Sequence, residues 1–249
     1  MGKLGIQKED KKYLFDVLLC IFLYLFAVSL PAPSFLTQQA FTGAMRFLFL
    51  IPIAWLLLAD GFKLTLGSLK GVFLCLPMLL IAFGNMTSLW VRGQGALIEG
   101  SEIERLALFT FGTALVEEIV FRLALMQLLA KTSLKRFDVL ISAAIFGLCH
   151  IFALLSGSGV LPVLQQVGYT FALGLLLGVA YKYGGLIAPF LIHFVFNFFQ
   201  TDLYLSVEGG SWDVLFYALN ISFYIFSFGY AFFLMWKGGY LKEILRRNS

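Results

Sequence analysis

Three charged residues interrupt an apolar stretch that is long enough to cross a lipid bilayer. Glu117, Glu118 and Arg122 lie within FTFGTALVEEIVFRLALMQLLA, residues 109–130. On insertion scales, a charged side chain near the bilayer centre costs about 2.5 to 3.5 kcal/mol, so such residues face a bundle interior and mark functional sites. The stretch therefore predicts a buried helix of a membrane bundle, and it is the first place to look for chemistry.

The composition extends this prediction to the whole chain. Of the 249 residues, 60% are hydrophobic and only 13% are charged, whereas soluble domains carry about a quarter charged residues. A membrane span needs roughly 20 residues, so the length allows about eight spans and no sizeable soluble domain. We predict an all-α fold, a polytopic membrane helix bundle formed as a single integral membrane domain over residues 1–249.

Apolar runs separated by turn residues place the spans. We predict them at about 13–30, 44–59, 71–90, 104–130, 138–155, 161–181, 186–201 and 214–236. If the N-terminus lies inside, most of the 18 lysines and arginines fall on the inner side, with Arg46, Arg92 and Arg105 as the outer exceptions. This asymmetry follows the positive-inside rule and predicts that both termini are cytoplasmic. The net charge of +4 thus reflects topology, and we expect no nucleic-acid partner.

Small residues and the absence of a repeat add further expectations. Cys20, Cys75 and Cys149 lie in apolar segments at spacings that match no metal site or disulfide framework, so we predict buried, unpaired thiols. Gly174 and Gly178 form a small-xxx-small pair that predicts close helix packing. No inverted repeat is visible, which weighs against a transporter.

The two adjacent carboxylates point in different directions. Glu118 and Arg122 are four residues apart, so they share a helix face and can pair. Glu117 lies about 100° around the helix from Glu118 and meets a different neighbour. We therefore expect Glu118 to be held by Arg122 while Glu117 stays free for chemistry.

Both histidines of the chain lie on other apolar helices. His150 shares a face with Phe146, and His193 shares a face with Asn197. Each alone could be a core histidine bonded to a carbonyl or to a neighbouring helix. At ~1.5 Å per residue from the span ends, however, both histidines, Asn197 and Glu117 fall in the middle third of the bilayer. This shared depth predicts one functional site.

The residue types favour hydrolysis of an amide bond. A carboxylate and an imidazole near a water molecule can serve as general base and general acid. A second imidazole and a carboxamide can donate hydrogen bonds to a developing oxyanion. A zinc site is the alternative, because Glu117, His150 and His193 could supply three ligands, although the sequence has no H-E-x-x-H motif.

At these residues the sequence resembles the CAAX prenyl protease and bacteriocin-processing family of intramembrane proteases, known as CPBP or Abi. The family motifs are E-E-x-x-x-R, F-x-x-x-H and H-x-x-x-N/B. Here they read Glu117-Glu118-Ile119-Val120-Phe121-Arg122, Phe146-Gly147-Leu148-Cys149-His150 and His193-Phe194-Val195-Phe196-Asn197. All three are complete and in the family's order, within a motif-bearing core over residues 104–201.

The resemblance implies a role for each motif residue. Glu117 and His150 would activate the hydrolytic water, and His193 and Asn197 would stabilise the oxyanion. Glu118 and Arg122 would hold the site in shape, supported by Phe146. The implied enzyme is an intramembrane endopeptidase of the glutamate type, with no cofactor; a zinc metalloprotease is the alternative.

The resemblance also implies a setting and two rival functions. The chain is short with small loops and looks like a bacterial member, which implies a multi-pass protein of the bacterial cytoplasmic membrane acting on a membrane-embedded peptide or protein. Bacterial members are linked to peptide maturation and bacteriocin immunity. One rival is a non-catalytic immunity or scaffold protein of the same family. The other is a proton-coupled carrier that uses Glu117 and the histidines as a relay.

Overall fold

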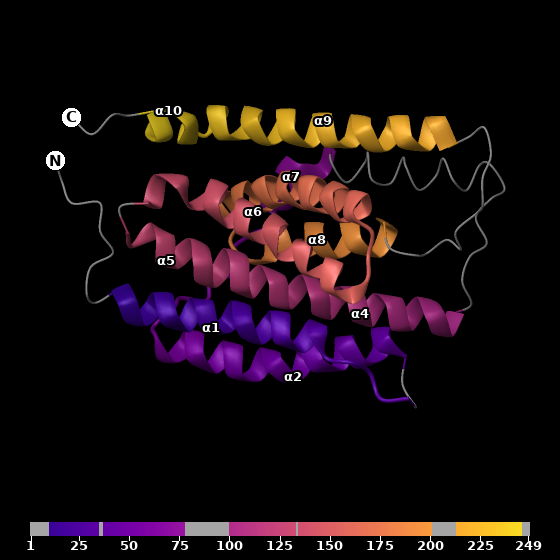
Figure 1. Ribbon diagram of the computed structural model, residues 1–249. Coiled ribbons are helices and arrows are strands. Elements are labelled where there is room, and N and C mark those ends of the chain that lie inside the picture. Colours follow the sequence, from indigo (N-terminus) through magenta and orange to yellow (C-terminus); the bar gives the residue numbers. More distant parts are fainter. Residues whose placement is uncertain (1–9, 35–36, 78–99, 133, 201–212, 246–249) are drawn as a thin grey trace.

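The computed structural model describes residues 10–34, 37–77, 100–132, 134–200 and 213–245, and these residues form helices and connecting turns without a strand (Figure 1). The elements are α1 (Asp10–Ser29), α2 (Gln38–Ala59), α4 (Gly100–Glu118), the π-helix η1 (Ile119–Leu125), α5 (Met126–Ala130), the 3-10 helix η2 (Lys135–Phe137), α6 (Asp138–Cys149), the 3-10 helix η3 (His150–Ser156), α7 (Val160–Gly184), α8 (Ile187–Gln200), α9 (Asp213–Lys237) and α10 (Tyr240–Leu245). The all-α prediction is confirmed.

Helical residues occupy every range that the sequence predicts as a span. The third range is helical over 70–77, and its remainder lies outside the described residues. Four described segments are long and apolar enough to cross a membrane: Lys11–Ser29, Ala40–Ala59, Lys135–Leu154 and Val160–Gly184. The number of eight spans and the cytoplasmic termini stay predictions. The short helix α10 was not predicted.

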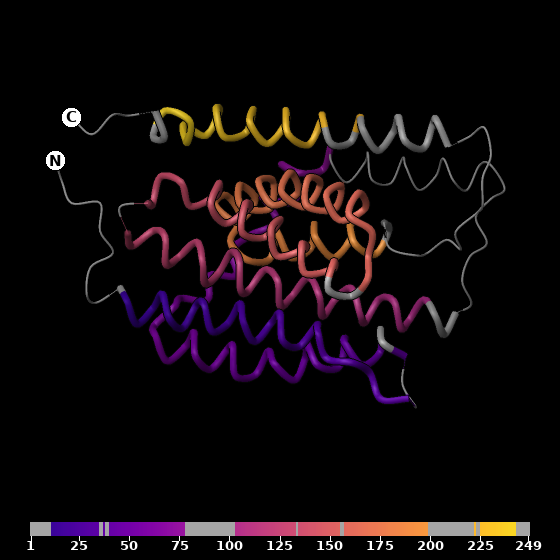
Figure 2. Tube along the Cα trace, viewed as in Figure 1, coloured from indigo at the N-terminus to yellow at the C-terminus, as the bar shows by residue number. Residues whose placement is uncertain are grey.

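Helix α7 lies at the centre of the bundle. It packs against α6, α8 and α9, whereas α1, α2 and α4 pack together on the other side (Figures 1 and 2). One apolar cluster surrounds α7, and a second joins α1 and α2 to residues 116–129. The three motifs lie on α4 with η1, on α6 with η3, and on α8, so they meet where the two halves of the bundle join.

Glycines set the distance between α6 and α7. A Cβ atom on Gly174 would lie 3.0 Å from Ala143 Cα, and one on Gly178 would lie 2.9 Å from Val139 Cγ1. Separations this short leave no room for a larger residue. The predicted close packing at Gly174 and Gly178 is confirmed, and it brings the α7 backbone next to the motif residues.

An extended segment fixes the start of α8. The backbone N–H groups of Leu186 and Ile187 donate to the carbonyls of Thr65 (2.8 Å) and Leu66 (2.9 Å). Gly67 lies in this segment with φ +79°, and a Cβ atom there would overlap the Gly184 carbonyl. Only glycine satisfies both requirements. Because α8 carries His193 and Asn197, this contact positions one wall of the site.

We predict that Gly67→Ala lowers the free energy of unfolding by more than about 1 kcal/mol, because alanine disfavours a positive φ and its methyl group overlaps the α7–α8 turn. The measurement is thermal unfolding of the purified protein in detergent micelles. Gly168→Ala is the matched control, since Gly168 lies on α7 with no atom within 4 Å of an added Cβ. It should leave the protein as stable as the wild type or more stable. Equal melting temperatures for Gly67→Ala and wild type would refute this role of the segment.

Candidate active site

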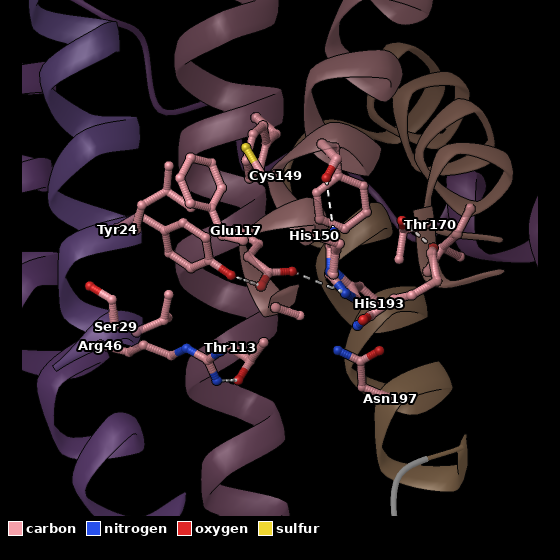
Figure 3. Close-up of a pocket in the computed structure, with 18 of the residues that line it drawn as sticks. Tyr24, Ser29, Arg46, Thr113, Glu117, Cys149, His150, Thr170, His193 and Asn197 are labelled. Atoms are coloured by element: carbon pink, nitrogen blue, oxygen red, sulfur yellow. Dashed lines mark hydrogen bonds and ion pairs between the residues drawn. The ribbon is translucent and has the colours of Figure 1, made fainter. Parts of the chain in front are cut away.

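A cavity of about 770 Å³ opens between the helices that carry the motifs. Glu117, His150, His193 and Asn197 all line it (Figure 3). Its wall also includes side chains from α1, α2 and α7, most of them apolar. The structure therefore brings together, around one space, the four residues that the sequence predicts as catalytic.

Glu117 is buried at the end of α4 and has contacts on both carboxylate oxygens. Its Oε1 accepts a hydrogen bond from the Tyr24 hydroxyl of α1, and its Oε2 lies 3.5 Å from His193 Nε2. The expectation that the Glu117 carboxylate has no side-chain partner is therefore wrong. Its carboxylate is oriented from two sides, by a phenol and by an imidazole, and still borders the cavity.

His193 lies between the two carboxylates. Its Nδ1 is 2.7 Å from Glu118 Oε1, and its Nε2 faces Glu117 Oε2. A carboxylate only accepts hydrogen bonds, so Nδ1 carries a proton towards Glu118. The 3.5 Å between Nε2 and Oε2 is an ion-pair contact and not a hydrogen bond. The ring is thus fixed by Glu118 and lies beside Glu117.

Arg122 binds the same oxygen of Glu118 that His193 contacts. Its guanidinium donates to Glu118 Oε1 at 3.0 Å and to the Gly174 carbonyl at 3.4 Å, and the side chain is fully buried. The predicted pairing of Glu118 with Arg122 is confirmed. The additional bond to Gly174 ties this pair to α7, at the glycine that allows close helix approach.

A π-helix begins directly after the two glutamates. Residues 119–125 form η1, which contains Arg122 and is followed by the α-helical residues of α5. The Ser142 hydroxyl of α6 donates to the Phe121 carbonyl in this segment at 2.8 Å. Wide turns of this kind occur often at functional sites. The first motif therefore has a local backbone geometry that its residue spacing did not reveal.

Phe146 connects the two histidines and the arginine. Its ring meets the His150 and His193 rings edge-on, with centroids 5.3 and 5.7 Å apart. The Arg122 guanidinium carbon lies 4.5 Å from the ring centre, a cation–π distance. This buried ring fills the space between the three motifs, and the supporting position predicted for Phe146 agrees with these contacts.

His150 is oriented by its own helix. Its Nδ1 lies 3.0 Å from the Phe146 carbonyl oxygen. A carbonyl can only accept, so this bond assigns the proton to Nδ1 and leaves Nε2 of the neutral ring as an acceptor. The expected shared face of Phe146 and His150 is confirmed. The bond lies at the point where α6 ends and η3 begins.

The cavity also contains residues that the sequence analysis did not select as site residues. Tyr24 of α1, Arg46 of α2 and Thr113 of α4 line it, and the Arg46 guanidinium donates to the Thr113 hydroxyl. Thr113 precedes Glu117 by one helical turn, a spacing that could have identified it. Tyr24 lies in an apolar run with no distinguishing pattern, so only the fold reveals it.

Three of the side chains that could bind a metal contact one another. His193 uses both ring nitrogens on Glu117 and Glu118, and Cys149 is a free thiol at the cavity wall. Within the described residues, no group of three or more His, Cys, Asp or Glu side chains is arranged to hold a metal ion. Cys20 and Cys75 are unpaired and buried, as predicted, whereas Cys149 is unpaired but only half-buried, so the prediction of burial is wrong for this residue.

Comparison with known proteins agrees with the geometry over the range that carries the motifs. Residues 100–199 match the family model described as Rce1-like, type II CAAX prenyl endopeptidase Rce1-like. The matched range contains all three motifs, while Tyr24 and Arg46 lie outside it. No curated protein matches the chain, and no solved structure does. Residues 100–199 thus form an Rce1-like domain, and this match supports the resemblance of the chain to the CAAX protease family.

Proposed function

We propose that this protein is an intramembrane endopeptidase that hydrolyses a peptide bond of a membrane-associated peptide or protein. The observation that carries the proposal is the shared cavity: Glu117, His150, His193 and Asn197 come from three separate helical segments and line the same space. The match of residues 100–199 to a protease family supports the reaction class. The glutamate mechanism and the role of each residue are our proposal.

Glu117 and His150 activate the hydrolytic water in this mechanism. Both present an acceptor to the cavity, Glu117 through its carboxylate and His150 through Nε2, since His150 Nδ1 is bonded to the Phe146 carbonyl. The water oxygen attacks the scissile carbonyl carbon while a proton passes to Glu117. When the carbon–nitrogen bond breaks, a proton is delivered to the leaving amine. One base and one acid at the same site suffice for this sequence.

His193 and Asn197 stabilise the oxyanion. Glu118 fixes His193 through Nδ1, as a carboxylate orients the imidazole of a catalytic triad. His193 Nε2 lies 3.5 Å from Glu117 Oε2 without a hydrogen bond between them, so a proton on Nε2 can be donated to an oxyanion that forms beside Glu117, and the Asn197 carboxamide lies one turn further along the same helix face. Donors held in place before the reaction stabilise developing charge without reorganisation. Arg122 keeps Glu118 in position for this task.

We predict that Glu117→Gln lowers peptide cleavage by at least about 100-fold, because general base catalysis typically contributes 10² to 10⁴. Cleavage is measured by mass spectrometry of peptides released from membranes that contain the purified full-length protein. Glu104→Gln is the matched control, since Glu104 is an exposed glutamate of the same helix. Cleavage that persists in folded Glu117→Gln at the level of Glu104→Gln would contradict the proposal. Bacteriocin immunity that survives Glu117→Gln would assign that phenotype to a non-catalytic role.

Arg122 and Glu118 provide a test that separates stability from catalysis. We predict that Arg122→Met alone destabilises the protein by about 3–5 kcal/mol, since it leaves a buried carboxylate with one partner fewer. Adding Glu118→Leu should restore most of the melting temperature, because apolar residues replace the whole ion pair. Activity should stay low in the double variant, because His193 has lost its orienting carboxylate. A stable and fully active double variant would show that Glu118 does not position His193.

Metal analysis separates the glutamate mechanism from the zinc alternative. We predict that the purified, active protein contains far less than one zinc per chain and keeps its cleavage rate after treatment with a chelator. Elemental analysis and the same peptide assay provide both measurements. Stoichiometric zinc together with chelator-sensitive cleavage would overturn the glutamate mechanism and favour water activation by a metal.

A further inference from the structure

Arg46 is a buried cation in the wall of the cavity that no motif includes. It lies on α2, outside the range matched by the protease family, with 9% of its surface exposed. Its guanidinium donates to the Thr113 hydroxyl, and its central carbon lies 4.8 Å from the centre of the Phe109 ring. Arg46 has no role in the water activation or oxyanion stabilisation proposed above.

Among the described residues, Arg46 has a buried donor without an acceptor and no countercharge. Within the described part of the chain no carboxylate pairs with Arg46, and its Nε is buried without a hydrogen-bond partner. Arg122, the other arginine near this cavity, is paired with Glu118. A buried guanidinium without a countercharge is costly, and a ligand with a complementary anion recovers that cost.

The position of Arg46 relative to the hydrolytic residues follows from α4. Phe109, Thr113 and Glu117 recur every four residues and all line the cavity, so they share one helix face. Thr113, the partner of Arg46, is therefore ~6 Å along the helix axis from Glu117. In the close-up, Arg46 and Thr113 lie on the same side of the Glu117–His193 pair as Asn197 (Figure 3).

We propose that Arg46 binds a carboxylate of the peptide substrate, about two residues from the scissile bond. The inference rests on the proposed endopeptidase function. An extended peptide advances ~3.3–3.6 Å per residue, so the ~6 Å offset spans about two residues. A guanidinium can receive a carboxylate through two parallel hydrogen bonds, which lysine could not reproduce. The carboxylate is either the substrate's C-terminus or the side chain of an Asp or Glu.

This assignment makes Arg46 a specificity-determining residue. A site built to pair a polar group discriminates strongly against substrates that lack the group, because its own buried partner is then left unsatisfied. The apolar remainder of the wall accepts hydrophobic side chains without comparable discrimination. The enzyme would thus cut apolar peptides at a bond that lies about two residues from a carboxylate of the substrate.

The test is digestion of a complex peptide library by the full-length protein in lipid nanodiscs, with products identified by mass spectrometry. The readout is the ratio of cleavage at sites with a carboxylate about two residues away to cleavage at matched sites without one. We expect a ratio of at least about ten for wild type, since losing one partner of a buried charge pair costs more than a factor of ten. Arg46→Gln should reduce it to about one while neutral sites are still cut.

Companion variants and a second library make each outcome decisive. Arg46→Lys should keep part of the preference, and Arg136→Gln, an arginine substitution outside the cavity lining, should keep all of it. The ratio is taken within each sample, so a smaller folded fraction does not alter it. In a library with amidated C-termini, lost preference identifies the C-terminal carboxylate as the ligand, and retained preference identifies Asp and Glu side chains.

Two results would overturn the proposal. The first rejects only the role of Arg46, and the second also rejects the endopeptidase function. If Arg46→Gln keeps the wild-type ratio, or wild type shows no preference for carboxylates, Arg46 does not read the substrate although the endopeptidase function stands; Arg46 would then serve the fold or bind lipid phosphate. If wild type and Glu117→Gln yield the same products, the proposed function fails and the role of Arg46 fails with it.

Discussion

A single carboxylate oxygen, Glu118 Oε1, connects the parts on which this site depends. It contacts the Arg122 guanidinium at 3.0 Å and His193 Nδ1 at 2.7 Å. The side chains of Glu118, Arg122 and His193 are all buried. In an apolar interior an unpaired charge is prohibitively costly, so each of these groups restricts where the others can lie. The network joins α4 and η1 to α8 directly, and Arg122 extends it to the α7 backbone at Gly174. The geometry of the candidate site and the packing of the helices therefore depend on the same bonds.

Around this network the two halves of the chain contribute different functions. The range that matches the protease family supplies the proposed water-activating and oxyanion-stabilising residues. The first two helices complete the cavity from outside that range: Tyr24 orients Glu117, and Arg46 adds a positive charge one turn away. In this account the shared chemistry resides in the matched helices. We propose that the selectivity of this particular chain resides in the helices that precede them.

The sequence predicted the helical class, the helix positions and the residues that share the cavity, because charges in an apolar chain are rare and their spacing fixes which face they occupy. Its prediction for Glu117 failed in part, since the hydroxyl that binds it comes from an apolar helix about ninety residues earlier, where no local pattern marks a tyrosine as a partner. The bridging of both glutamates by His193 likewise depends on how α8 packs against α4. The π-helix was also invisible, because it reflects tertiary contacts such as Ser142 to Phe121 and not a residue preference.

The most direct test of the central claim uses the fact that the chain has only two histidines. Nitrogen-15 NMR of histidine-labelled protein in nanodiscs, with each ring assigned through a His→Gln variant, reports which ring nitrogens carry protons. We predict a protonated Nδ1 on both rings, and we predict that the His193 signals shift in both Glu117→Gln and Glu118→Gln. A His193 spectrum that neither substitution changes would mean that the imidazole does not bridge the two glutamates, and it would contradict the site described here.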